Sequence, residues 1–141
     1  GIGTTKPFEY IGSPWLDKLD FAAKLNALEM PGVIFRPMAF IPNYGVYAGE
    51  LCQGVQMHIT DKRSFQPAHV GAQMVRLLMK DYSQRDLFPR RSSDGYKIDI
   101  ALGESSLRYA EIPLGDIFNR WDRENAYFAE KAQPYLLYPL K

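Results

Sequence analysis

Residues 47–61 read YAGELCQGVQMHITD, and this stretch decides the fold because its second half alternates between apolar and polar side chains. The apolar positions are Val55, Met57 and Ile59. The positions between them carry small or polar groups, namely Gly54, Gln56, His58 and Thr60. Successive side chains of a β-strand point to opposite faces of the sheet, so the pattern predicts a half-buried strand. One face closes a core, and the other suits polar ligands or water.

Three other segments have the periodicity of amphipathic helices. The first is expected to be capped by the hydroxyl of Ser13, to carry Pro14 in its first turn and to end near Glu29. The second begins at about Pro67. Its core-facing stripe consists of Val70, Met74, Leu77, Leu78 and Tyr82. The third covers residues 115–131. Its buried face consists of Ile117, Trp121, Phe128 and Ala132.

Shorter segments complete the expected fold. Residues 33–41 are rich in strand formers, and Pro37 within them argues for an edge strand or a bulge because proline has no N–H to donate. Residues 98–102 are expected to form a short strand or turn, residues 104–111 a short helix, and residues 135–138 a terminal strand. The result is an α+β fold with a small mixed or antiparallel sheet and about three main helices.

Composition bounds the organisation and the partners. A chain of 141 residues, 46% of them hydrophobic, can bury the core of a single domain, so residues 1–141 are read as one domain. The 17 Lys and Arg residues balance 16 Asp and Glu residues, and this net charge of +1 disfavours a nucleic-acid partner. No run approaches the ~18 apolar residues of a membrane span. The chain opens as if in mid-loop, which suggests a piece of a longer protein.

The chain has a single cysteine, and neither a metal nor a cofactor site is expected. Cys52 cannot form an internal disulfide, so the cysteine count indicates neither an oxidising nor a reducing compartment. Cys52 and the two histidines, His58 and His69, lack a zinc-site spacing. Cys52 and His58 also lie about 20 Å apart along a strand, too far for a nucleophile and its base. The glycines before Thr4 are too sparse for a phosphate loop.

Acidic residues are the more informative class. Glu50 and Asp61 bracket the predicted strand, and Glu9 lies in the opening loop, so up to three carboxylates could border one cleft. Glycosidases use two carboxylates about 5 Å or ~6.5–9.5 Å apart. Each acid also fits a capping or solvated role, and a small free-standing enzyme would need Glu50 and Asp61 to face one pocket.

Further along, residues 90–95 fit an exposed loop or, through the pair of arginines, an anion site.

Several motifs together resemble one bacterial family. They are GTTKPFEYIGSPWLD (Gly3–Asp17), MPGV (Met30–Val33), FRPMAFIP (Phe35–Pro42), YAGELCQGVQMHITD (Tyr47–Asp61) and PYLLY (Pro134–Tyr138). In this order they resemble the C-terminal part of NamZ-type exo-β-N-acetylmuramidases, a family formerly of unknown function. The resemblance covers nearly the whole chain.

The resemblance implies a C-terminal, cleft-forming domain of a peptidoglycan glycoside hydrolase that removes N-acetylmuramic acid from non-reducing ends. It also implies a missing Rossmann-like N-terminal domain as partner, a muramyl-containing glycan as ligand and a periplasmic or extracellular location. The family's catalytic acids have no counterpart here, so no catalytic residue is assigned and the chain alone is expected to be inactive. The resemblance implies that Thr4, Thr5, Glu50 and His58 bind or orient the muramyl sugar. Glu9, the carboxylate in the same opening loop, is the fifth predicted sugar-binding residue. The alternative is a non-catalytic glycan-binding or interaction module.

Overall fold

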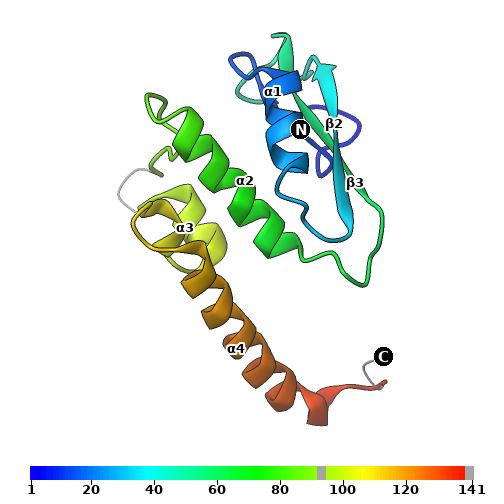
Figure 1. Cartoon of the computed structure of the whole chain (residues 1–141), viewed down its shortest axis with the longest axis vertical. Coiled ribbons are helices and arrows are strands. Elements are labelled where there is room, and N and C mark those ends of the chain that lie inside the picture. The colour runs from blue at the N-terminus through cyan, green and yellow to red at the C-terminus, as the bar shows by residue number, and fades with distance from the viewer. Residues whose placement is uncertain (92–94, 139–141) are drawn as a thin grey trace. The chain divides into compact units, whose positions relative to one another are not determined.

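The computed structural model in Figure 1 describes residues 1–91 and 95–138. The chain divides into two compact units, Gly1–Val70 and Gly71–Lys141. Whether residues 1–141 act as one domain stays a prediction. Residues 92–94, in the middle of the loop expected between the second and third helices, lie outside the described residues. None of the helices in the described part is long and apolar enough to cross a membrane.

Unit 1 is built on a three-stranded antiparallel sheet in the order β1–β3–β2. The strands are β1 (Tyr10–Ser13), β2 (Val33–Phe40) and β3 (Cys52–Ile59). The strand predicted from alternation is therefore confirmed and is the central one. β2 is an edge strand, as Pro37 indicated, since only one side of an edge strand has to supply ladder hydrogen bonds.

Helix α1 (Lys18–Asn26) covers one face of this sheet and forms the core with it. Its buried side chains and those of the facing strands include Phe21, Ala22, Leu25, Val33, Phe35 and Val55. The Asn26 amide joins helix to sheet, because it accepts from the Phe35 N–H at 2.9 Å and donates to the Phe35 carbonyl at 2.8 Å. The predicted apolar face of β3 is thus confirmed at Val55, which is fully buried, but not at Ile59, which is 47% exposed at the end of the strand. The opposite face of the sheet is free of helices from unit 1.

The predicted start of the first helix was wrong. Ser13 does not cap it but ends β1, where it pairs with Gln53 and is buried. The cap is Asp17, whose carboxylate accepts the N–H groups of Leu19 at 2.8 Å and Asp20 at 3.1 Å. A carboxylate at this position satisfies the first free amides of the helix and favours its positive end, so the helix begins four residues later than expected.

Unit 2 is helical. Helix α2 (Pro67–Asp81) begins just before the boundary between the units, and α4 (Leu114–Ala132) matches the expected third helix. Residues Lys97–Leu102 form helix α3 and not a strand, because Gly103 in the left-handed region (φ 74°) supplies a helix stop that outweighs the strand preference of the isoleucines.

Three further expectations for unit 2 were wrong in part. Within residues 104–111 only Ser106–Arg108 is helical, as a single 3₁₀ turn (η1). The tail forms a second 3₁₀ turn, Gln133–Tyr135 (η2), followed by irregular backbone instead of a strand; Pro134 fits the first turn of this helix, which takes Tyr135 out of the expected strand. On α4 the side chain of Ile117 is fully buried, but Phe128 is 70% exposed, so the apolar stripe is covered only in its first half.

Candidate functional site

The sheet face opposite α1 carries a connected group of polar side chains, which we call the polar sheet face: Lys6, Glu9, Arg36, Gln56 and His58. The register of the strands assembles it, because Gln56 of β3 lies opposite Arg36 of β2 on one side and Tyr10 of β1 on the other. Glu9 directly precedes β1, and its carbonyl accepts the N–H of Met57 at 2.9 Å. Residues from three separate segments of the sequence therefore meet on one surface.

Gln56 is the centre of this face. Its side chain is only 4% exposed, and both ends of its amide are hydrogen-bonded. The amide oxygen accepts from the Arg36 guanidinium at 2.8 Å, and the amide nitrogen donates to the Glu9 carboxylate at 2.8 Å. Gln56 thus fixes a cation on one side and an anion on the other.

The Glu9 carboxylate also accepts from the Lys6 ammonium at 2.8 Å. The hydrogen bond from Lys6, then that from Gln56, and more weakly the nearby His58 hold the pKa of Glu9 below its ordinary value. Glu9 is therefore an ionised acceptor at neutral pH and is not tuned as a proton donor.

His58 lies two residues beyond Gln56 on the same face of β3, opposite Ile34 of β2. Its Nε2 atom is buried and has no hydrogen-bond partner. Buried polar atoms are normally satisfied, so an unpartnered imidazole nitrogen beside Glu9 and Gln56 is a feature that a ligand could use.

An aromatic pair lies next to Gln56 in the direction away from His58, toward the start of β3. The rings of Tyr10 and Phe40 stack with centroids 5.4 Å apart. Gly12 leaves room for the Phe40 ring, since a Cβ there would lie 3.1 Å from it. Gly54 lets β1 and β3 approach each other, since a Cβ there would collide with the Ile11 carbonyl. Ring faces beside hydrogen-bonding groups suit ligands that have both apolar and polar edges.

The structure brings only some of the five predicted sugar-binding residues together. Glu9 and His58 share the polar sheet face. Thr4 lies in the preceding turn, where its hydroxyl donates to the Gly1 carbonyl at 2.6 Å and accepts the Lys6 N–H at 3.2 Å. Thr5 is exposed in the same turn. Glu50 is also exposed; it lies just before the start of β3, whereas His58 lies near the end of that strand.

The same placement separates Glu50 from Asp61. They flank opposite ends of an eight-residue strand, which at ~3.3 Å per residue keeps them more than about 20 Å apart. Asp61 instead organises a turn, accepting the Arg63 N–H at 3.0 Å and the Ser64 hydroxyl at 2.8 Å. A small free-standing glycosidase built on this pair is therefore excluded.

Sequence reasoning missed Lys6 and Arg36 and gave Gln56 no individual role. Arg36 is the one charged residue in β2, and the parity of β2 already placed it on the face away from Val33 and Phe35. What the sequence did not contain was the pairing register that sets Arg36 opposite Gln56.

Unit 2 contains a second polar cluster, and its groups are used structurally. Glu104 accepts hydrogen bonds from Ser106, Arg120 and Trp121, which ties the segment before η1 to α4. Burial alone would raise the pKa of Glu104, but these hydrogen bonds together lower it. Arg108 pairs with both oxygens of Asp99, at 2.7 Å for the shorter contact from its Nε atom.

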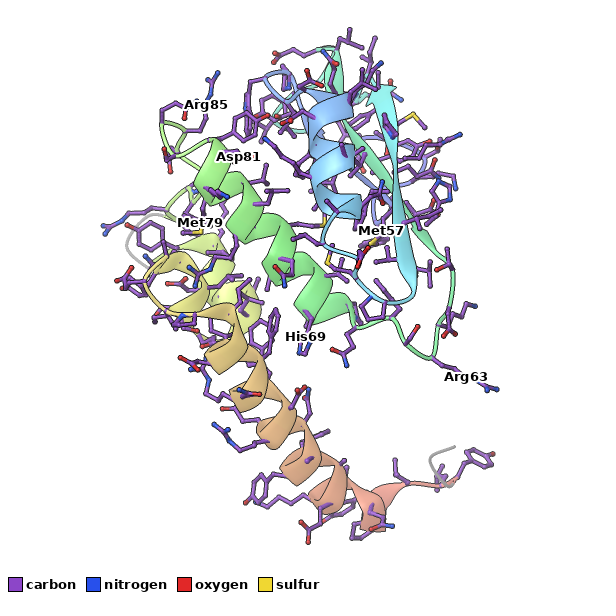
Figure 2. All side chains as sticks on the ribbon, viewed as in Figure 1. Met57, Arg63, His69, Met79, Asp81 and Arg85 are labelled. Carbon is purple, nitrogen blue, oxygen red and sulfur yellow. The ribbon has the colours of Figure 1, made fainter. Side chains whose placement is uncertain are left out.

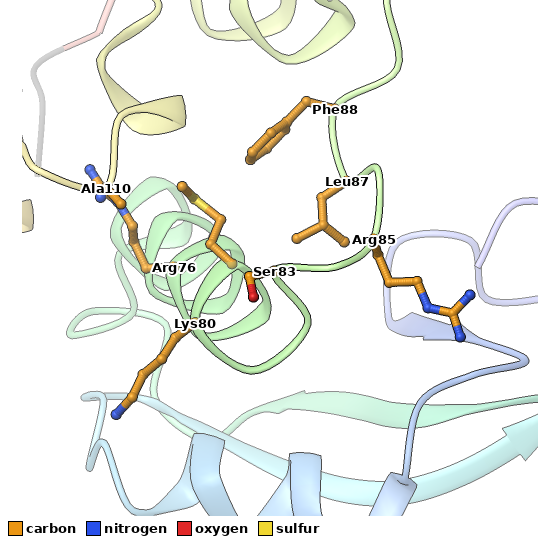
Figure 3. Close-up of a pocket in the computed structure, with 8 residues that line it drawn as sticks. Arg76, Lys80, Ser83, Arg85, Leu87, Phe88 and Ala110 are labelled. Atoms are coloured by element: carbon orange, nitrogen blue, oxygen red, sulfur yellow. The ribbon is translucent and has the colours of Figure 1, made fainter.

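A pocket in unit 2 lies between the end of α2 and the loop that follows it (Figure 3). Leu87 and Phe88 point into it, whereas the charged ends of Lys80 and Arg85 extend away. Arg76, also in its lining, donates to the Ile112 carbonyl at 2.7 Å and so supports the neighbouring loop. The pocket is mainly apolar and carries no carboxylate. Among the described residues, no group of three or more His, Cys, Asp and Glu side chains is placed to hold a metal ion.

Cys52 is a free cysteine at the start of β3 and is fully buried. Burial raises the pKa of its thiol, which keeps it protonated at neutral pH. The expectation of a small buried cysteine is confirmed.

Comparison with known proteins shows similarity over nearly the whole chain. Residues 1–138 match the family model described as exo-β-N-acetylmuramidase NamZ, C-terminal. The chain is 32% identical over 142 aligned residues to the peptidoglycan β-N-acetylmuramidase NamZ of Bacillus subtilis (strain 168), with 98% of this chain covered. It is also similar to the crystal structure of a DUF1343 family protein from Bacteroides fragilis, with a TM-score of 0.81 and 28% identity over 97% of this chain.

The matched region is only part of each relative. The chain spans 33% of the length of the Bacillus subtilis protein and 37% of the Bacteroides fragilis chain. About two thirds of each relative therefore has no counterpart here.

Proposed function

The chain belongs to the family of C-terminal domains of NamZ exo-β-N-acetylmuramidases, and from this membership we propose that it forms one side of a glycan cleft in a peptidoglycan hydrolase. The match over residues 1–138 is the observation that carries the proposal, and the Bacillus subtilis relative supports it. The parent enzyme would release N-acetylmuramic acid from the non-reducing ends of peptidoglycan fragments. Since peptidoglycan lies outside the cytoplasmic membrane, the proposed location is periplasmic or extracellular.

The polar sheet face is the proposed contribution of this chain to the cleft. Glu9 and His58 would accept or donate hydrogen bonds to sugar hydroxyls and the acetamido group, and Gln56 would hold the Glu9 carboxylate in place. The stacked rings of Tyr10 and Phe40 offer an apolar surface to the carbons of a sugar. Thr4, Thr5 and Glu50 remain proposed sugar-binding residues on exposed loops.

The chemistry itself is proposed to come from the rest of the parent protein. Glycoside hydrolysis needs a pair of carboxyl groups across the scissile bond. Glu9 is engaged by Lys6 and Gln56, and Glu50 lies far from Asp61, so neither supplies such a pair. The chain alone would therefore bind the glycan without cleaving it.

Hydrolysis of a chromogenic N-acetyl-β-muramide tests this division of roles. The full-length parent and the 141-residue chain are assayed side by side. Turnover by the parent alone supports the proposal, and turnover by the isolated chain contradicts the statement that its catalytic acids lie elsewhere. If neither cleaves the muramide but muramyl glycan still binds, the domain is a non-catalytic glycan-binding module.

A further inference from the structure

Arg36 differs from the other charged groups of the polar sheet face because its charge is not neutralised. Lys6 pairs with Glu9 at 2.8 Å, so these two opposite charges cancel locally. Arg36 donates to the neutral amide of Gln56 at 2.8 Å, and within the part of the chain that the structure describes it forms no ion pair. The face therefore presents one exposed guanidinium that is held in place but has no anion.

The way in which Arg36 is held leaves its binding capacity open. A guanidinium has five N–H donors in a planar fork, and the hydrogen bond to Gln56 uses Nη2. The remaining edge matches the two oxygens of a carboxylate. Gln56 is buried and is itself anchored on Glu9, so the fork is oriented by a strand and not by a mobile loop.

The surroundings of Arg36 restrict the ligand further. Ile34 and Met38 lie two residues to either side on the same face of β2, and Ile34 is 54% exposed. A carboxylate that binds Arg36 would thus have apolar groups beside it. A carboxylate on a short branched carbon chain fits this arrangement better than a phosphate, which has no apolar part.

We propose that Arg36 binds the carboxylate of the lactyl ether of N-acetylmuramic acid, with the lactyl methyl group against Ile34 or Met38. This inference rests on the proposed function, since it names the part of the proposed substrate that the polar sheet face binds. The lactyl ether is the group that distinguishes N-acetylmuramic acid from N-acetylglucosamine. Arg36 is therefore a specificity residue, and Gln56 is the residue that positions it.

The first experiment is a titration of the isotope-labelled 141-residue chain followed by NMR of the Arg36 Nε–H and the Gln56 side-chain amide. The ligands are N-acetylmuramic acid, its lactyl methyl ester, which is neutral, and N-acetylglucosamine. A charge-assisted hydrogen-bonded pair predicts that the acid binds about 10–100-fold more tightly than the ester. Arg36→Gln should abolish this difference, and Arg36→Lys should retain part of it.

The matched control is Arg63→Gln. Arg63 is exposed on the loop after β3, and its side chain extends away from the sheet (Figure 2). This variant should keep the full preference for the acid. Equal affinity for acid and ester in the natural chain, absence of any shift at Arg36, or the same loss in both arginine variants would overturn the assignment.

The muramide assay on the full-length parent separates this inference from the proposed function. If the parent hydrolyses the muramide but Arg36→Gln lowers kcat/KM equally for the acid and the methyl ester, the role of Arg36 is wrong and the proposed function stands. If the parent is inactive but the isolated chain still prefers the acid through Arg36, the proposed hydrolase fails and the carboxylate site stands.

Discussion

Replacing Gln56 with alanine removes the residue that connects the polar sheet face. The substitution eliminates two hydrogen bonds of 2.8 Å, one from Arg36 and one to Glu9. Hydrogen bonds to charged groups stabilise by roughly 1.5–3 kcal/mol. Arg36 and Glu9 are accessible enough to return to water, so we expect the loss of Gln56 to lower the free energy of unfolding of unit 1 by about 2 kcal/mol.

Gln53→Ala is the matched control, because Gln53 lies on the same strand with its side chain on the opposite face. The two variants share the loss of strand propensity and of the same atoms. They differ in the hydrogen bonds and in burial, since Gln56 is buried and Gln53 is half-buried. We expect the control to cost less than about 1 kcal/mol.

Amide hydrogen exchange at Met57 is the appropriate assay, since its N–H donates to the Glu9 carbonyl at 2.9 Å and reports the pairing of β1 with β3. A loss of 1–2 kcal/mol corresponds to exchange about 5–30-fold faster. If Gln56→Ala exchanges no faster than Gln53→Ala, Gln56 does not hold the face together, and the positioning role given to it is wrong.

Three further predictions concern single positions. Gly54→Ala should destabilise unit 1 by more than about 2 kcal/mol in thermal denaturation, because its Cβ would collide with the Ile11 carbonyl and push β1 from β3. Gly71→Ala should instead raise stability by about 0.5–1 kcal/mol, since it lies within α2 and its Cβ meets open space; a lower melting temperature would contradict this. Folding lowers the pKa of Glu9, so its ionised form stabilises the fold above its ordinary pKa of 4.5 and that contribution is lost as the pH falls through the lower folded value. Below pH 4.5 the melting temperature of Glu9→Gln should therefore fall less steeply with decreasing pH than that of the natural chain. Equal slopes for the two chains in this pH range would show that Glu9 contributes nothing.

Local patterns predicted those parts of the fold in which neighbouring residues decide the structure. The alternation around Val55 marked β3 correctly, and Pro37 identified β2 as an edge strand. The same kind of reasoning failed where distant residues compete. Ser13 is a good helix cap by residue type, but pairing with Gln53 keeps it in the sheet and leaves the cap to Asp17.

The candidate site was only partly predictable for the same reason. Glu9 was found as a carboxylate of the opening loop and His58 as a polar group of the predicted strand, whereas Arg36 was missed although it lies in a motif of the same family and its strand was predicted correctly. The interaction between Arg36 and Gln56 joins residues twenty positions apart in the sequence, and it depends on register. Composition and spacing do not contain that register.

The register of β2 against β3 is set on the core side of the sheet and determines the geometry on the other side. Val33 and Phe35 are 7% and 4% exposed under α1, so a slip of one residue would expose them and turn Arg36 toward the core. The same alignment places Arg36 opposite Gln56. The guanidinium is consequently oriented by the packing of Phe35 and not by the polar contacts alone. A core substitution that shifts this pairing should therefore abolish the preference for a carboxylate ligand without touching any residue of the polar sheet face.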